Sequence, residues 1–75
     1  MKIKNIGSNM VEVQTEKATV LVSYSTPVAA CLHTAPFGFI RTSKKWSVTT
    51  SKHINKWLDG AKAKEVDQSV LDTIL

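Results

Sequence analysis

Apolar and polar residues alternate along the first part of the chain at the spacing of β-strands. The alternation is clear at residues 10–14, directly after a turn-forming Gly-Ser-Asn cluster at 7–9. This pattern predicts a β-hairpin over residues 2–14. The run 18–24 is rich in β-branched residues, which favour a pleated surface, and it predicts a central strand of the same sheet.

Two prolines interrupt the strand pattern that follows. Pro27 cannot donate a backbone hydrogen bond to a central ladder, so we expect it to break the chain before a further strand at 28–33. The two alanines in that run also permit a helical turn. Pro36 ends the run, and the bulky residues at 37–42 predict another strand. The sequence therefore predicts a small antiparallel sheet of about four strands over residues 2–42.

The apolar spacing then lengthens to a helical period, which predicts a helix over residues 50–59. Thr49 or Thr50 can cap its first turn, because a hydroxyl accepts the otherwise unpaired amide protons there. Gly60 is well placed to end the helix in a left-handed conformation. The apolar stripe expected to face the sheet consists of Ile54, Trp57 and Leu58.

A second short helix is expected at the end of the chain, over residues 67–75, with Asp67 as its N-cap. The intervening residues 60–64 are interpreted as a linker. Together these elements predict one α+β domain over residues 1–75, in which both helices pack on one side of the sheet.

Length and composition restrict the class of protein. The chain has 75 residues, of which 43% are hydrophobic and 21% charged. A domain of this size buries only about 60% of its unfolded surface, so a deep cleft is not expected. No run approaches the roughly 18 apolar residues of a membrane span, so no membrane partner is expected. A lone Cys31 and a start without an apolar signal segment indicate an intracellular protein.

Positive charge is concentrated in the middle of the chain. The formal net charge is +4, yet residues 17–58 contain no acidic residue at all. Such a concentration of cations indicates a contact surface for phosphates or for an acidic protein patch. It also occurs as a solvated face that keeps a small protein soluble. The candidate binding residues are the five cations of segment 41–56, namely Arg41, Lys44, Lys45, Lys52 and Lys56.

Other candidate chemistry is sparse. Cys31 and His33 are expected on one strand face and His53 on the later helix, but no acidic residue near 31–33 could complete a nucleophilic or metal site. We therefore predict no catalytic residue, no metal, no cofactor and no small-molecule substrate. Trp46 precedes the helix: if exposed it can stack on a nucleic-acid base, and if buried it anchors the loop.

Two segments carry a resemblance. The first is a Tyr-x-Thr-Pro-Val-Ala strand break at residues 24–29, and the second is an aromatic-Ser-x-Thr-Thr-Ser-Lys-His-Ile-Asn signature at residues 46–55. In both, the chain resembles a widespread family of small phage and prophage proteins of unknown function, over most of its length. The resemblance implies a phage origin and the cytoplasm of a bacterial host, and it transfers no functional residues. The second signature also has a structural interpretation, as helix capping and burial.

The sequence leaves three functional hypotheses. The favoured one is a non-enzymatic binding module that docks segment 41–56 on nucleic acid, or on the acidic surface of a host complex that handles nucleic acid. The second is a protein–protein inhibitor of restriction, CRISPR or transcription machinery, and the third is a structural homo-oligomer. The inhibitor would be anchored by the aromatic residues Trp46, Phe37 and Phe39.

Overall fold

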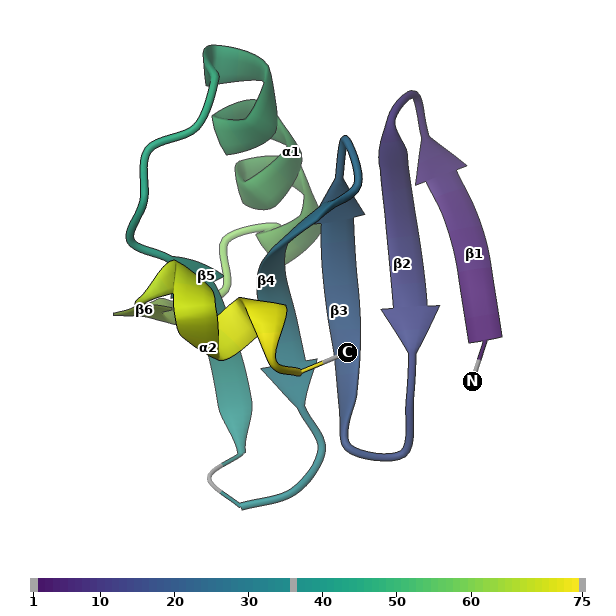
Figure 1. Cartoon of the computed structure of the whole chain (residues 1–75), viewed down its shortest axis with the longest axis vertical. Coiled ribbons are helices and arrows are strands. Elements are labelled where there is room, and N and C mark those ends of the chain that lie inside the picture. The colour runs from purple at the N-terminus through teal and green to yellow at the C-terminus, as the bar shows by residue number, and fades with distance from the viewer. Residues whose placement is uncertain (1, 36, 75) are drawn as a thin grey trace.

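The computed structural model describes residues 2–35 and 37–74 and contains six strands and two helices (Figure 1). The strands are β1 (Lys2–Gly7), β2 (Met10–Gln14), β3 (Ala18–Ser23), β4 (Thr26–Leu32), β5 (Gly38–Thr42) and β6 (Ala63–Val66). The helices are α1 (Val48–Leu58) and α2 (Gln68–Asp72). The predicted α+β class is confirmed. Pro36 and Leu75, which the sequence placed at a strand end and in the last helix, lie outside the described residues.

The strands form one six-stranded sheet in the order β1-β2-β3-β4-β5-β6. Neighbouring strands from β1 to β5 are antiparallel to one another, whereas β6 is parallel to β5. The sheet is therefore larger than the four strands predicted, and residues 60–64 are not simply a linker because Ala63 begins β6. A parallel neighbour requires a crossover connection, and α1 supplies it here. The segment is a strand because it pairs with β5, and its own sequence has no alternation of apolar and polar residues that would predict one.

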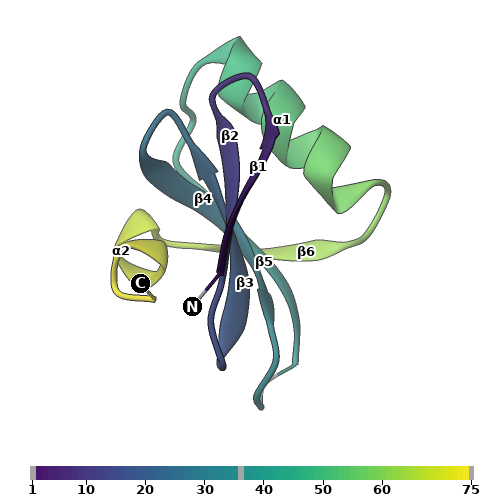
Figure 2. The same cartoon turned by 90° about the vertical axis from the view of Figure 1, so that its right-hand side faces the viewer.

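The two helices cover opposite faces of the sheet (Figure 2). This corrects the expectation that both pack on one side. The chain leaves α1, joins the edge of the sheet as β6 and reaches the other face before α2 begins, so each helix has its own core. The core under α1 contains Met10, Leu21, Val28, Ala29, Ile54 and Leu58. The core under α2 contains Ala18, Val20, Ala30, Ile40 and Leu71.

Pro27 lies inside β4 and does not precede it. The register between β3 and β4 shifts at this point, because Leu21 pairs with Ala29 while Val22 pairs with Pro27. Val28 is therefore an extra, unpaired residue on β4. A bulge of this kind accommodates a residue that cannot donate to the ladder. The preceding hairpin turn uses two residues with positive φ, Tyr24 at 51° and Ser25 at 74°. Such values suit a two-residue hairpin turn.

Helix α1 begins two residues earlier than the sequence predicted. Its N-cap is Ser47, whose Oγ accepts a hydrogen bond from the Thr50 amide at 3.1 Å. The expected cap residue Thr50 is buried instead, and its hydroxyl lies 3.2 Å from Ser23 Oγ. A threonine used for packing against the sheet cannot also stand outside the helix as its cap.

The helix ends were predicted with partial success. The left-handed C-cap of α1 is Asp59, with φ 47°, and Gly60 follows with φ 86°. Asp67 caps α2 as predicted, because its side chain accepts a hydrogen bond from the Ser69 amide. The apolar stripe of α1 is confirmed for Ile54 and Leu58, which are buried, while Trp57 is half-buried beside them.

Candidate polyanion-binding site

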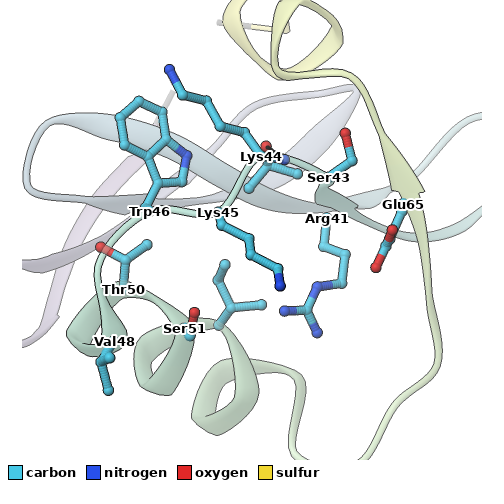
Figure 3. A pocket seen from close by; sticks show the side chains of 11 residues that line it. Arg41, Ser43, Lys44, Lys45, Trp46, Val48, Thr50, Ser51 and Glu65 are labelled. Atoms are coloured by element: carbon cyan, nitrogen blue, oxygen red, sulfur yellow. Dashed lines mark hydrogen bonds between the residues drawn. The ribbon is translucent and has the colours of Figure 1, made fainter.

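A pocket of about 420 Å³ lies between α1 and the loop that connects it to β5 (Figure 3). Its walls come from β5, from the loop at residues 43–47, from α1 and from β6. The volume falls in the range of small-ligand pockets. The pocket lies beyond the end of β5, where the chain leaves the sheet for α1.

Three of the five predicted cations line this pocket: Arg41, Lys44 and Lys45. Arg41 is part of β5 and shares a sheet face with α1, whereas the two lysines follow in the loop. The loop is held close to the sheet, because the Ser43 amide donates to the Val66 carbonyl at 2.8 Å. The Lys44 amide bonds Thr42 Oγ1 at 3.1 Å, which turns the chain just after the strand.

Arg41 is half-buried and only weakly engaged within the protein. Its Nη1 donates to Asn55 Oδ1 over a long distance of 3.4 Å. Its Nε is buried and has no hydrogen-bond partner among the residues that the structure describes. An unpaired buried donor costs about 1–3 kcal/mol, so the guanidinium is incompletely satisfied within the protein.

Trp46 combines the two roles that the sequence left open. Its side chain is 38% exposed, and its Nε1 donates to Gln68 Oε1 at 3.1 Å, which anchors the loop to the start of α2. Gln68 also donates from Nε2 to the Pro27 carbonyl at 2.7 Å. The Lys44 ammonium lies 4.2 Å from the centre of the indole ring, a cation–π contact (Figure 3). The loop is therefore attached to α2 through the Gln68 side chain, which is itself bonded to the backbone of β4.

Lys52 and Lys56 are exposed on α1 and are not part of the pocket lining. The structure thus divides the predicted segment into three cations at the pocket and two on the outer surface of the helix. The first turn of α1 contains no acidic residue, so its positive dipole end is not neutralised there.

Glu65 also lines the pocket and was missed by sequence reasoning. It lies on β6 in register with Arg41, so both side chains share the face of the sheet that α1 covers. Its contribution depends on the pairing of β6 with β5, and a four-residue strand with one carboxylate gives no local signal. Ser51 on α1 was missed for a similar reason, because a serine in a helix gives no sequence signal that it lines a pocket.

Cys31 and the two histidines are dispersed. Cys31 is half-buried in β4, and His33 Nε2 lies 2.9 Å from Thr19 Oγ1. His53 Nδ1 lies 2.9 Å from Ser23 Oγ, and its ring stacks on Tyr24 with centroids 5.8 Å apart. Within residues 2–35 and 37–74, no group of three His, Cys, Asp or Glu side chains could hold a metal ion.

These features define a small α+β protein with a cationic pocket at a strand–helix–strand crossover. The model of a family of unknown function, DUF8033, matches residues 1–73, so the chain belongs to this family. No curated protein and no solved structure matches the chain. Neither helix of the described part of the chain is long and apolar enough to cross a membrane.

Proposed function

We propose that the chain is a non-enzymatic binding module that docks on a polyanionic target through segment 41–56, with nucleic acid as the preferred target. The observation that carries this proposal is the position of Arg41, Lys44 and Lys45 around one concave site. A guanidinium presents a planar fork that matches two phosphate oxygens, and an ammonium adds a point charge beside it. Hydroxyl groups such as that of Ser51 bind phosphate oxygens as well.

The surroundings of the pocket support the same proposal. Lys52 and Lys56 extend the positive surface along α1, and the helix dipole adds positive potential at its start. Neutralising phosphates with lysine and arginine releases condensed counterions, which is the main source of affinity in sequence-independent binding. The family resemblance of residues 24–29 and 46–55 adds the proposal of a phage-type protein that acts in the cytoplasm of its bacterial host.

A protein contact is the second candidate, favoured by a different surface. The α2 face of the sheet carries a groove of about 330 Å³ over β1, β2 and β3. Its apolar lining residues are Ile3, Val11, Val13, Val22 and Tyr24. Ile3 is 70% exposed, and Tyr24 is 51% exposed. An apolar patch of this kind is typical of protein interaction surfaces, including contacts between copies of one chain.

The aromatic anchors expected for an inhibitor do not share one surface. Phe37 is 76% exposed just before β5, whereas Trp46 follows the other end of that strand. Phe39 is half-buried, with its ring 6.0 Å from that of Trp57 in an edge-to-face arrangement. An inhibitor would therefore use the groove on the α2 face rather than these three rings together.

A salt titration tests the proposed function. Binding of a fluorescent oligonucleotide is measured by anisotropy as salt is raised from about 50 to about 200 mM. Phosphate contacts predict a log-linear loss of affinity, with a slope close to the number of phosphates neutralised. Absence of binding at the lowest salt would contradict the proposal. Oligonucleotide binding that is insensitive to salt would also contradict phosphate contacts. Sedimentation of the chain alone tests the homo-oligomer.

A further inference from the structure

The pocket beside α1 is lined by more than cations. Figure 3 shows the side chains of Arg41 and Lys45 pointing into the space between β5 and α1, one from the strand and one from the loop. Ser51 lies on the helix wall of the same space. These groups form a phosphate-binding set in which two cations and a hydroxyl converge from three elements.

The Arg41 guanidinium has donors to spare for such a phosphate. Among the described residues it donates one hydrogen bond, to Asn55 Oδ1, and that bond is long at 3.4 Å. A guanidinium has five N–H donors in a fixed fork. The half-buried position of Arg41 restricts this fork, so less rotamer freedom is lost when an anion arrives than for a fully exposed side chain.

The remaining lining is unsuited to a bare phosphate. Glu65 places a carboxylate in the same pocket, where it repels an inorganic anion. The same carboxylate accepts hydrogen bonds from a base amino group or a sugar hydroxyl. Trp46, which is 38% exposed, adds an aromatic surface against which a flat base can pack. A nucleotide offers all three kinds of group at once: phosphate, hydrogen-bond donors and a flat ring.

We infer that this pocket binds one unpaired nucleotide of a single-stranded nucleic acid, with its phosphate between Arg41 and Lys45 and its base or sugar toward Glu65. The inference rests on the proposed function and makes it more specific. In a duplex the base is held in the stack, and flipping it out costs a few kcal/mol. A duplex can touch the exposed Lys52 and Lys56, but it cannot place a base in the pocket without that cost.

The test compares a labelled single strand with the same strand annealed to its complement. Three chains are measured by anisotropy: the parent, Ser51→Leu and the control Thr49→Leu. Both variants place a leucine on α1, and leucine is a good helix former. Ser51 lines the pocket, whereas Thr49 is exposed and is not part of the lining. Neither substitution changes a charge, and each removes one hydroxyl, so their position relative to the pocket is the main difference between them.

The parent should bind the single strand at least about tenfold more tightly than the duplex, the scale of one stacked base. Ser51→Leu should lower single-strand affinity by about tenfold and leave duplex affinity unchanged, while Thr49→Leu changes neither. If Ser51→Leu binds the single strand as tightly as the parent, or the parent binds both forms equally, the inference is overturned and the proposed function stands. If the parent binds neither the single strand nor the duplex, the proposed function itself is overturned.

A second variant covers the case in which Ser51→Leu disturbs the fold, which circular dichroism reports. Lys45→Gln changes an exposed loop residue and leaves α1 intact. Because Lys45 points into the pocket, it should weaken single-strand binding by a larger factor than duplex binding. An equal loss for both forms would place Lys45 on a general phosphate surface and reject the nucleotide pocket.

Discussion

The indole Nε1 of Trp57 donates a hydrogen bond to Oε2 of Glu12, at 3.1 Å and across 45 residues of sequence. The bond ties the last turn of α1 to β2, and the same ring lies edge-on to Phe39 of β5. The end of α1 is thereby attached to two strands of one sheet face. Since α1 forms one wall of the cationic pocket, the geometry of that pocket depends on this attachment.

Replacing Trp57 tests the attachment. Trp57→Ala should lower the free energy of unfolding by about 3 kcal/mol, toward the low end for a large aromatic because the side chain is half-buried. Trp57→Phe keeps the ring contacts and loses the hydrogen bond to Glu12, so it should cost about 1 kcal/mol. Urea unfolding measures both. If Trp57→Ala unfolds at the same urea concentration as the parent, α1 is held on the sheet by Ile54 and Leu58 alone.

Gln68 supports the pocket from outside. It accepts the Trp46 indole hydrogen bond and donates to the Pro27 carbonyl, which connects the loop, β4 and α2. Gln68→Ala should therefore speed amide hydrogen exchange at residues 43–47 and weaken anion binding, although no cation is removed. Hydrogen exchange in this loop at the parent rate would mean that Trp46 packing, rather than the Gln68 bonds, holds it.

Cys31 should be dispensable. It is half-buried in β4 and is not part of the pocket lining. Cys31→Ala leaves a small cavity and should cost about 1 kcal/mol of stability, with binding unchanged. Thermal unfolding and anisotropy measure the two effects. A large loss of binding in a folded Cys31→Ala chain would return the cysteine to the list of functional candidates.

Asp67 gives a pH-dependent prediction. The Ser69 hydroxyl, and after it the Ser69 amide, hold the pKa of Asp67 below its ordinary value of 3.8. A carboxylate with a lowered pKa stabilises the folded state above the unfolded pKa, and this stabilisation is lost as pH falls through the folded pKa. The Tm difference between the parent and Asp67→Asn should therefore shrink below about pH 4. A difference that stays constant down to acid pH would assign the capping effect to geometry alone.

Local signals predicted the elements that depend on local spacing. The stripe of Ile54 and Leu58 identified α1, and the alternation at residues 10–14 identified β2, because each pattern is complete within its own segment. The N-cap was misassigned because several hydroxyl residues precede the helix with similar capping preference. The contact of Thr50 on α1 with Ser23 at the end of β3 decides between them.

Elements created by tertiary pairing were not predictable in the same way. β6 has four residues and is a strand because it pairs with β5 after the crossover. The sequence therefore did not predict that Glu65 lines the pocket. For the same reason it did not predict that α2 packs on the second face of the sheet. The charge cluster itself was visible, but its division between pocket and outer helix surface depends on how α1 is rotated on the sheet.

The central claim, that segment 41–56 contacts a polyanion, is tested most directly by pairwise charge removal. The variants are Lys44→Gln with Lys45→Gln, Lys52→Gln with Lys56→Gln, and the control Lys2→Gln with Lys4→Gln, which removes two exposed charges from β1. Because exposed charges contribute little to folding, all three should melt close to the parent.

The deciding measurement is the salt slope of oligonucleotide binding in these three double variants. The account predicts weaker binding for both segment variants, with slopes shallower by about one unit per lysine removed, and a slope equal to the parent's for the β1 control. An equal loss of affinity in all three double variants would show that binding depends on the net charge of the chain and not on segment 41–56. Parental affinity in both segment variants would contradict the account and leave segment 41–56 as a solubility feature.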